Sequence, residues 1–471
     1  MLREKLKQAK PVSLLTLAAI LVVLIALMSA YSIFSGSAGG LTWTFFYYGK
    51  YAFMIPLIVL AFFNRKISRS EKKAAILIGL LVSVPIFLQG IWSVFLWLHN
   101  GTEFPYISRG ISNLLFTLIA AIGGVAVGML FKSKAPALLA WSCVAVYALA
   151  ILMGIASNGP GWIKALNPLA NRSSTDYVEL HEVAYVLGML VLYFVLMNRE
   201  RTTPYRTLLC VLCLVFFVIA GKRIGYLALL FCLVYGLIEK KAPRKIKRVL
   251  LRIGEVCAIV LCFLYIVITM SDDLITILND LGISSMGRNI IFNYFRQFGS
   301  LDPGFLGNGA GFVSRQFDYT TAAELYNMAS IKALHNDLFK MFLEMGTIGC
   351  IVWLVFWNGY IPEKVSRKAG LRAGTNCAIL IFYSMITYMT DNTAGYFMYQ
   401  AVLSCLLFLN AWNGIRAREA KQSILAQSLA AEELSAASKS AASDSADESQ
   451  TPSSAFRRGR IPGRQKQEVP A

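Results

Sequence analysis

Residues 249–270 read VLLRIGEVCAIVLCFLYIVITM and lead directly into a polar stretch from Ser271 to Asp337. As a helix, such a run is long enough to cross the roughly 30 Å hydrocarbon core of a bilayer. The polar stretch is the one long interruption in a chain that otherwise alternates apolar runs with short linkers. The sequence therefore predicts an all-α, polytopic membrane protein with one large loop.

The composition supports this class. With 56% hydrophobic residues, 15% charged residues and a mean hydropathy of +0.58, the chain cannot form an ordinary soluble domain. We expect about twelve transmembrane helices, and the first should be an anchor because no small-residue cleavage site follows it. The predicted spans are Val12–Phe34, Thr42–Phe63, Ala74–Leu98, Ile111–Phe131, Ala135–Ser157, Tyr177–Met197, Tyr205–Ala220, Ile224–Ile238, Val249–Met270, Leu338–Trp357, Thr375–Met389 and Ala394–Trp412.

The net charge of +19 does not indicate a nucleic-acid partner, because the basic residues cluster in alternate loops. The first two basic clusters are Arg3–Lys10 and Arg65–Lys73. The short loops between the basic loops carry few basic residues. This is the positive-inside bias of membrane proteins. It predicts a multi-pass protein of the cell membrane with both termini in the cytoplasm and the Ser271–Asp337 loop outside.

Four segments follow. Residues 1–270 should hold helices 1–9, residues 271–337 a helical extracytoplasmic loop, and residues 338–412 helices 10–12. Residues 413–471 are rich in Ala, Ser, Glu and Gln and predict a disordered cytoplasmic tail. The nine cysteines lie in apolar spans without disulfide or metal-ligand spacing. We therefore expect no metal site.

Lys222 and Arg223 separate two apolar spans that are each barely long enough to cross the membrane. Two short helices joined by a tight turn fit best, with the basic pair near the outer headgroups. Ordinary anchoring to headgroups explains such a pair. A functional role is an equal alternative, because the pair lies on the side where basic residues are otherwise few.

Arg288 lies near the start of the segment Ser285–Phe298, whose polar and apolar residues separate onto two faces of a helix. Arg288 falls between Phe292 and Phe295 on the apolar half. Such a position indicates an anionic partner. That partner is either a substrate group or an acidic residue of the loop.

His335 is one of only three histidines and lies where the loop meets the next span. Asn336 or Asp337 can cap the helix that begins at Leu338. The positive end of that helix disfavours protonation of the imidazole, which suits a general base. A lone histidine is more often structural. Nearby alternatives also stay open: the stretch Gly304–Gly311 is a phosphate-binding nest or a plain turn.

Taken in order, these elements resemble the O-antigen ligase and O-antigen polymerase family of bacterial integral membrane glycosyltransferases. The resemblance rests on Gly221–Gly225, Gly287–Asn289, Leu306–Gly311, Leu334–Leu338 and Glu344–Gly349. It implies a polyprenyl-diphosphate-linked glycan as donor at the outer face of the membrane, without cofactor or metal. Carried over, Lys222, Arg223 and Arg288 would bind the diphosphate, and His335 would deprotonate the acceptor hydroxyl.

Within this family we predict a surface polysaccharide polymerase that works in the lipid bilayer, with a flippase and chain-length regulators as candidate partners. The loop is compact, and Asp391 and Asn392, with Tyr396 and Tyr399, could line a groove for a growing chain. Asp391 and Asn392 would equally serve to cap a turn. The alternatives are a ligase that transfers the glycan to a lipid or protein anchor, a lipid-linked oligosaccharide flippase or transporter, and a non-catalytic scaffold.

Overall fold

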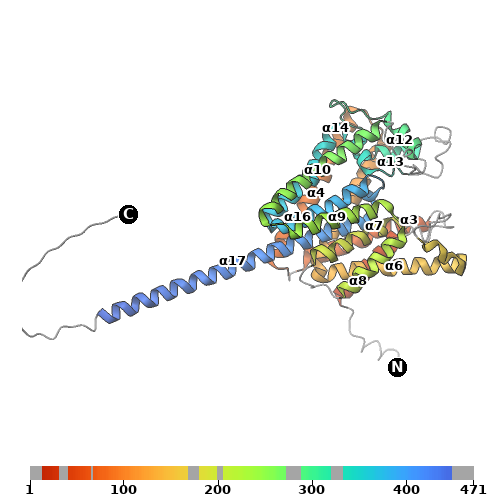
Figure 1. Cartoon of the computed structure of the whole chain (residues 1–471). Coiled ribbons are helices and arrows are strands. Elements are labelled where there is room, and N and C mark those ends of the chain that lie inside the picture. The colour runs from red at the N-terminus through yellow and green to blue at the C-terminus, as the bar shows by residue number, and fades with distance from the viewer. Residues whose placement is uncertain are drawn as a thin grey trace, which may run out of the picture. The chain divides into compact units, whose positions relative to one another are not determined.

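The computed structural model describes residues 13–30, 41–64, 67–167, 180–198, 205–271, 288–319 and 333–447. Their regular structure is entirely helical (Figure 1). The chain forms a large unit, Met1–Ala417, and a smaller one, Arg418–Ala471. Residues 272–287 and 320–332 of the predicted loop lie outside the described residues.

The helices follow the sequence pattern closely. They are α2 Leu14–Ser29, α3 Leu41–Phe63, α4 Arg69–His99, α5 Phe104–Phe131, α6 Ala135–Asn158, α7 His181–Leu192, α8 Arg206–Ala220, α9 Arg223–Lys241, α10 Arg244–Met270, α12 Arg288–Arg296, α13 Phe312–Tyr319, α14 Asp337–Val355, α15 Ile361–Ala369, α16 Leu371–Tyr388 and α17 Phe397–Asp447. The shorter turns are η2 Lys132–Lys134, η3 Pro160–Leu166, η4 Tyr193–Met197, η5 Phe356–Tyr360 and η6 Thr393–Gly395.

Each of the twelve predicted apolar runs overlaps one of these helices, and the all-α class is confirmed for the described residues. Within the described residues, five helical segments are long and apolar enough to cross a membrane: Phe45–Phe63, Arg69–His99, Phe104–Asn158, Arg244–Met270 and Asp337–Ala369. One of them, Phe104–Asn158, contains two predicted spans because η2 joins α5 to α6 without a loop. The total of twelve spans stays a prediction.

Many large apolar side chains are exposed on the helices of the large unit. Ile91 on α4, Leu230 on α9 and Val256 on α10 are 69%, 62% and 59% exposed. Such a surface suits contact with lipid, not water. In contrast, α7 is buried along its whole length from Val183 to Leu192. The N-terminus of α7 is therefore fixed from several sides, and it carries part of the candidate site.

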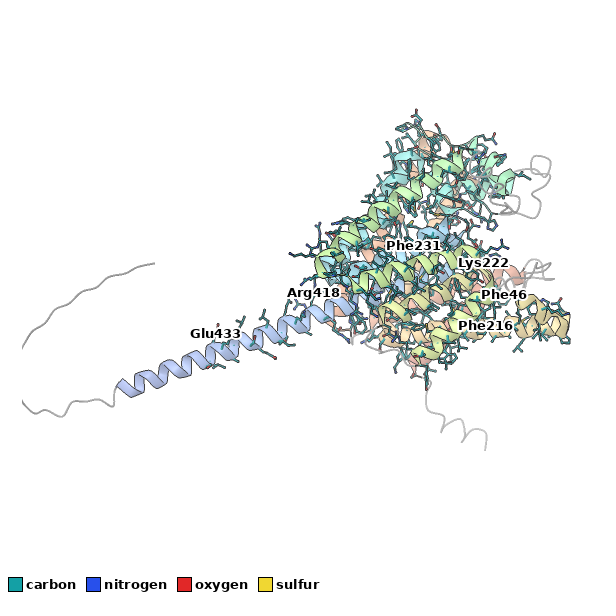
Figure 2. All side chains as sticks on the ribbon, viewed as in Figure 1. Phe46, Phe216, Lys222, Phe231, Arg418 and Glu433 are labelled. Atoms are coloured by element: carbon teal, nitrogen blue, oxygen red, sulfur yellow. The ribbon has the colours of Figure 1, made fainter. Side chains whose placement is uncertain are left out.

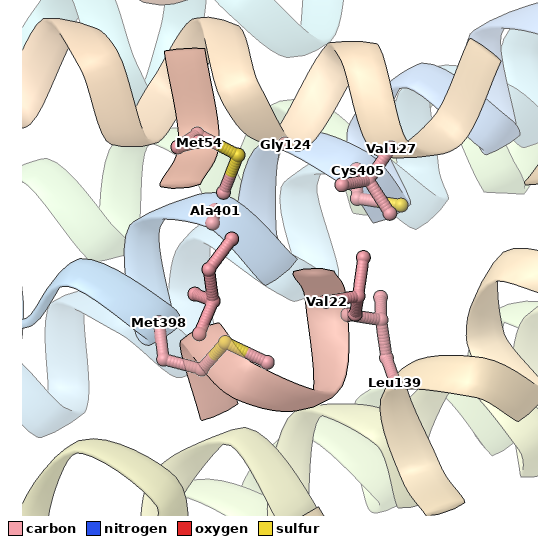
Figure 3. A pocket seen from close by; sticks show the side chains of 9 residues that line it. Val22, Met54, Gly124, Val127, Leu139, Met398, Ala401 and Cys405 are labelled. Carbon is pink, nitrogen blue, oxygen red and sulfur yellow. The ribbon is translucent and has the colours of Figure 1, made fainter. Parts of the chain in front are cut away.

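A small cavity lies among α2, α3, α5, α6 and α17 (Figure 3). It is lined by apolar side chains that include Val22, Met54, Leu139, Met398 and Cys405. No charged or hydroxyl group reaches it among the described residues. This cavity therefore offers nothing that would bind a diphosphate.

The glycine-rich segment before α14 is bonded to that helix at a break in it. Gly346 adopts φ 73° and ψ −178°, which only glycine tolerates well, and this interrupts the helical hydrogen bonds. The carbonyl groups of Leu343 and Glu344 instead accept the amides of Asn308 and Gly309 at 3.0 and 2.9 Å. The loop is thus bonded to α14 through its backbone.

The same contacts decide between the two interpretations of the glycine-rich stretch. The amide of Ala310 donates to the Ser93 hydroxyl at 2.9 Å, and the amide of Gly311 donates to the Glu344 carboxylate at 3.1 Å. Because protein groups already accept from these amides, as they do from those of Asn308 and Gly309, the plain turn is the better account.

Beyond residue 412 the structure differs from the sequence-based expectation. α17 continues as a helix to Asp447, where the composition had predicted disorder from residue 413. The described side chains from Arg416 to Ser435 are almost all exposed. Ala, Glu, Lys and Gln are strong helix formers, so local propensity accounts for a helix that buries little surface.

Candidate functional site

His335 lies directly before the N-terminus of α14. Asn336 caps that helix, since its side chain accepts the amide of Phe339 at 3.0 Å, as predicted. His335 itself has φ 51°, in the left-handed region that non-glycine residues rarely adopt. Such strain is concentrated at functional sites, where the surrounding structure enforces it.

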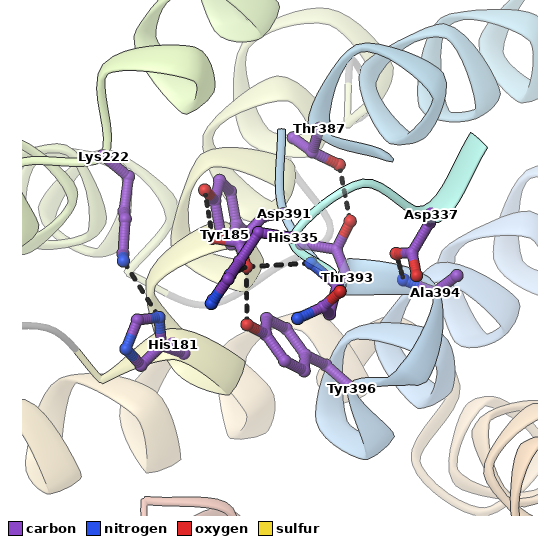
Figure 4. A network of polar contacts seen from close by, with 11 residues as sticks. His181, Tyr185, Lys222, His335, Asp337, Thr387, Asp391, Thr393, Ala394 and Tyr396 are labelled. Carbon is purple, nitrogen blue, oxygen red and sulfur yellow. Dashed lines mark hydrogen bonds and ion pairs between the residues drawn. The ribbon is translucent and has the colours of Figure 1, made fainter. Parts of the chain in front are cut away.

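The His335 imidazole faces Asp391, which lies between α16 and η6 (Figure 4). His335 Nδ1 and Asp391 Oδ1 are 3.5 Å apart, and the two side chains are 30% and 6% exposed. A carboxylate beside Nδ1 favours the tautomer with the proton on that nitrogen. The lone pair of a neutral ring is then on Nε2.

Asp391 is held by three further groups. Tyr185 donates its hydroxyl to Oδ2 at 2.8 Å, and Tyr396 donates to Oδ1 at 2.7 Å. The amide of Asn392 donates to Oδ1 at 2.8 Å. With both oxygens engaged, Asp391 is built to cap the turn and hold His335, so these contacts give no support to acceptor binding by its carboxylate.

The charge of Asp391 is also set by its surroundings. Burial alone would raise the pKa of this carboxyl, but the contact with His335 and the charges of Lys222 and His181 outweigh it. The resulting pKa is well below the usual range of an aspartate. Asp391 therefore remains ionised at neutral pH beside the histidine.

A second histidine joins the site from α7. Lys222 Nζ lies 2.9 Å from His181 Nδ1 (Figure 4), and Figure 2 labels Lys222 at the α8–α9 turn. Because an ammonium group can only donate, His181 accepts at Nδ1. The rings of His181 and Tyr396 have centroids 6.4 Å apart. Lys222 is thereby brought near Asp391, through His181 and Tyr396.

Arg223 is the first residue of α9 and follows a tight turn that closes at Gly221, with φ 71°. Its side chain is exposed, and no described residue forms a hydrogen bond or ion pair with it. The predicted two short helices with a tight turn are confirmed. Arg223 thus lies at the open edge of the site, not inside it.

Arg288 begins α12, and its side chain lies outside the described part of the chain. The predicted amphipathic character of this helix is confirmed, since Phe292 and Phe295 are buried while Asn293 is exposed. The rings of Phe292 and Phe339 have centroids 5.9 Å apart. Phe292 lies four residues after Arg288, and Phe339 lies four residues after His335. The contact between the two rings therefore makes the starts of α12 and α14 neighbours.

Of the two aromatic residues predicted for a glycan groove, Tyr399 lies in the interior and Tyr396 is half-buried. Tyr399 is fully buried, and its hydroxyl contacts Thr387 at 3.1 Å and Ser384 at 3.0 Å. Tyr396 is committed to Asp391. Asn392 is partly buried. Its backbone amide donates to the Asp391 carboxylate, so it contributes to the site by holding Asp391.

Sequence reasoning missed His181 and Tyr185 as parts of the site. His181 is one of the three histidines of the chain and lies at the start of α7. Tyr185 lies one turn further along α7. Nothing local marks these residues, because their partners Lys222 and Asp391 are 41 and 206 positions away.

The fold and the site define an all-helical membrane protein in which a histidine–carboxylate pair lies near Lys222, the N-cap residue of α9. Residues 208–354 match the family model described as O-antigen ligase. The chain therefore carries a domain of the O-antigen ligase family over these residues, and the resemblance inferred from the motifs is confirmed. No curated protein sequence matches the chain.

The matched region contains Lys222, Arg223, Arg288 and His335, whereas His181 and Asp391 lie outside it. The site therefore combines residues of the family domain with residues from α7 and the α16–α17 connection. Among the described residues, no group of three His, Cys, Asp or Glu side chains is placed to hold a metal ion.

Proposed function

We propose that the protein transfers a glycan from a polyprenyl diphosphate to a hydroxyl group of an acceptor at the outer face of the membrane. The observation that carries this proposal is the placement of His335 on ionised Asp391 at the start of α14. The His335 side chain is 30% exposed while its partner is buried, so part of the histidine side chain is open to a substrate. A base supported in this way can act on a substrate hydroxyl.

In the proposed step, His335 Nε2 takes the proton of the acceptor hydroxyl. The acceptor oxygen then bonds to the anomeric carbon of the donor sugar. The bond from that carbon to the phosphate oxygen breaks, and the electron pair leaves with the diphosphate. Asp391 stabilises the imidazolium that forms.

The departing diphosphate requires positive charge. Arg223 and Arg288 begin α9 and α12, where the helix N-termini add partial positive charge. A guanidinium group binds two phosphate oxygens at once. Lys222 is already paired with His181, so we assign it to the edge of this subsite and the arginines to the diphosphate itself.

The acceptor distinguishes polymerase from ligase. Residues 305–309 of the segment before α14 are bonded to that helix through the backbone, which favours a second carrier-linked glycan over a bulky surface anchor, so we retain the polymerase reaction. Deleting the gene and sizing the glycans decides it. A polymerase null leaves single repeats on the carrier or cell surface, whereas long polymer still attached to the polyprenyl carrier would identify a ligase.

The proposal also requires the site to face outward, with both termini in the cytoplasm. Leu301 is 39% exposed in the outer segment and suits a Leu301→Cys reporter, whereas exposed Ser428 on α17 suits a Ser428→Cys control. An impermeant thiol reagent should label Leu301→Cys in intact cells and Ser428→Cys only after permeabilisation. The reverse pattern would remove the site from the outer face and reject the proposal.

A further inference from the structure

Two charged side chains inside the membrane unit play no part in the mechanism above. Lys50 lies within α3, inside the predicted span Thr42–Phe63, and Glu182 lies in the first turn of α7. Lys50 Nζ and Glu182 Oε1 are 2.5 Å apart, with side-chain exposures of 1% and 11%. Charges within membrane segments are costly and usually have a function.

The ammonium group of Lys50 is enclosed by aromatic rings as well as by the carboxylate. It lies 5.3, 5.7 and 5.8 Å from the ring centroids of Tyr47, Tyr51 and Phe397. The rings of Tyr51 and Phe397 also contact each other, with centroids 4.8 Å apart. Cation–π attraction is strongest for such desolvated cations. Lys50 therefore connects α3 with α17 as well as with α7.

Glu182 makes a second connection through its other oxygen. Oε2 accepts the amide of Met398 at 3.4 Å. Met398 is the second residue of α17, and an amide in the first turn of a helix has no acceptor within that helix. Glu182 supplies the acceptor from α7, so the ion pair fixes where α17 begins relative to α7.

The residues next to these anchor points belong to the site. His181 directly precedes Glu182 and contacts Lys222. Tyr396 directly precedes Phe397 and donates to Asp391, which faces His335. A displacement of either helix start is therefore passed to the histidine–carboxylate pair.

We propose that Lys50 and Glu182 form a positioning pair for glycan transfer, which holds the starts of α7 and α17 so that Tyr396 and Asp391 keep His335 in place. This inference rests on the proposed function for its activity arm. Its structural arm is independent, because it predicts how His335 responds whatever reaction the protein performs.

The test uses Lys50→Met, Glu182→Gln and the double variant in the full-length protein. Each single variant leaves one buried charge without its partner and can fail to fold. The double variant removes both charges and keeps side chains of similar size. Glu71→Gln is the matched control, because Glu71 is a buried partner of Lys132, at 2.8 Å, in another ion pair of the membrane unit.

Ring-¹³C-labelled histidine gives a direct readout, since the chain has only three histidines, which single His→Gln variants assign. His335 contacts Asp391 and neither member of the pair. We expect the His335 signal to shift in the double variant and to stay in place in Glu71→Gln. In the double variant the His181 signal will shift whether or not the proposal holds, because His181 directly precedes Glu182. The His335 signal is therefore the informative one.

Transfer is measured in cells that lack the native gene, as polymer made per unit of inserted protein. We expect the double variant to be inserted normally yet to lose about 10- to 100-fold in transfer, the usual cost of a small misplacement of a catalytic group. An unshifted His335 signal, or normal transfer despite a shifted one, overturns the proposal. If the wild-type protein shows no transfer at all, the proposed function fails, and the His335 signal alone decides whether the pair positions it.

Discussion

The connection around Asp391, between α16 and η6, and the α8–α9 turn lie beside the same site but are built in opposite ways. Asp391 is buried, and both of its oxygens are held by Tyr185, Tyr396 and the amide of Asn392. Arg223, on the turn, is exposed and has no hydrogen-bond or ion-pair partner among the described residues. The first region is fixed in advance. In the second, Lys222 is paired with His181, but Arg223 is free to adapt to a ligand. Proton transfer needs such precision, and binding of a diphosphate tolerates adjustment.

The largest effect should come from the residue that the fixed region holds. His335→Ala should lower transfer by ~10² to 10⁴-fold, because a general base contributes about this much. Glycan produced per inserted protein is the measurement. His99→Ala is the control, since His99 is exposed at the end of α4 and far along the chain from these contacts. Normal polymer from a stably inserted His335→Ala variant would reject the assignment.

A smaller loss should follow from changing the support and keeping the base. Asp391→Asn preserves size but removes the charge beside Nδ1, and we expect transfer to fall by about 10²-fold because the imidazole loses its tautomer and orientation. Glu103→Gln, at an exposed glutamate that makes no capping bond, is the matched control. If both variants transferred glycan equally well, the fixed region would have no catalytic role.

The smallest effects should come from the two arginines assigned to the diphosphate, Arg223 of the adaptable region and Arg288 at the start of α12. Arg223→Lys and Arg288→Lys keep the charge but lose two-point contact with phosphate, so each should reduce transfer by about 10-fold. Arg109→Lys, at an exposed arginine of α5, is the control. Losses as large as that of Asp391→Asn would show that the basic region is as tightly organised as the acidic one. Full activity in both lysine variants would instead reduce its role to simple charge attraction.

The helices of this protein could be predicted from sequence because apolar runs report on lipid contact residue by residue. The site residues within short motifs, Lys222, Arg223, Arg288 and His335, could be proposed for the same local reason. The pairings could not. His335 meets Asp391 only through folding, and Lys50 meets Glu182 across 132 positions. The sequence around Lys50 therefore does not reveal its role, because its partner lies far away along the chain.

The tail shows a different limit. Composition alone predicts that residues 413–471 bury too little apolar surface to fold. Helix propensity is a separate property, and it is high in Ala, Glu, Lys and Gln. The described part of this region, up to Asp447, follows propensity. A low-burial composition therefore excludes a packed core but not a helix.

The junction at Gly346 has a consequence for how related chains can differ in length. Loops normally accept inserted or deleted residues, because little depends on their spacing. Here Phe305, Asn308 and Gly309 are bonded to α14 by backbone groups, on both sides of Gly346. One residue added between Phe305 and Asn308 would move one set of these bonds out of register with the other. Length variation in the outer segment should therefore fall on either side of residues 305–311 and spare that stretch.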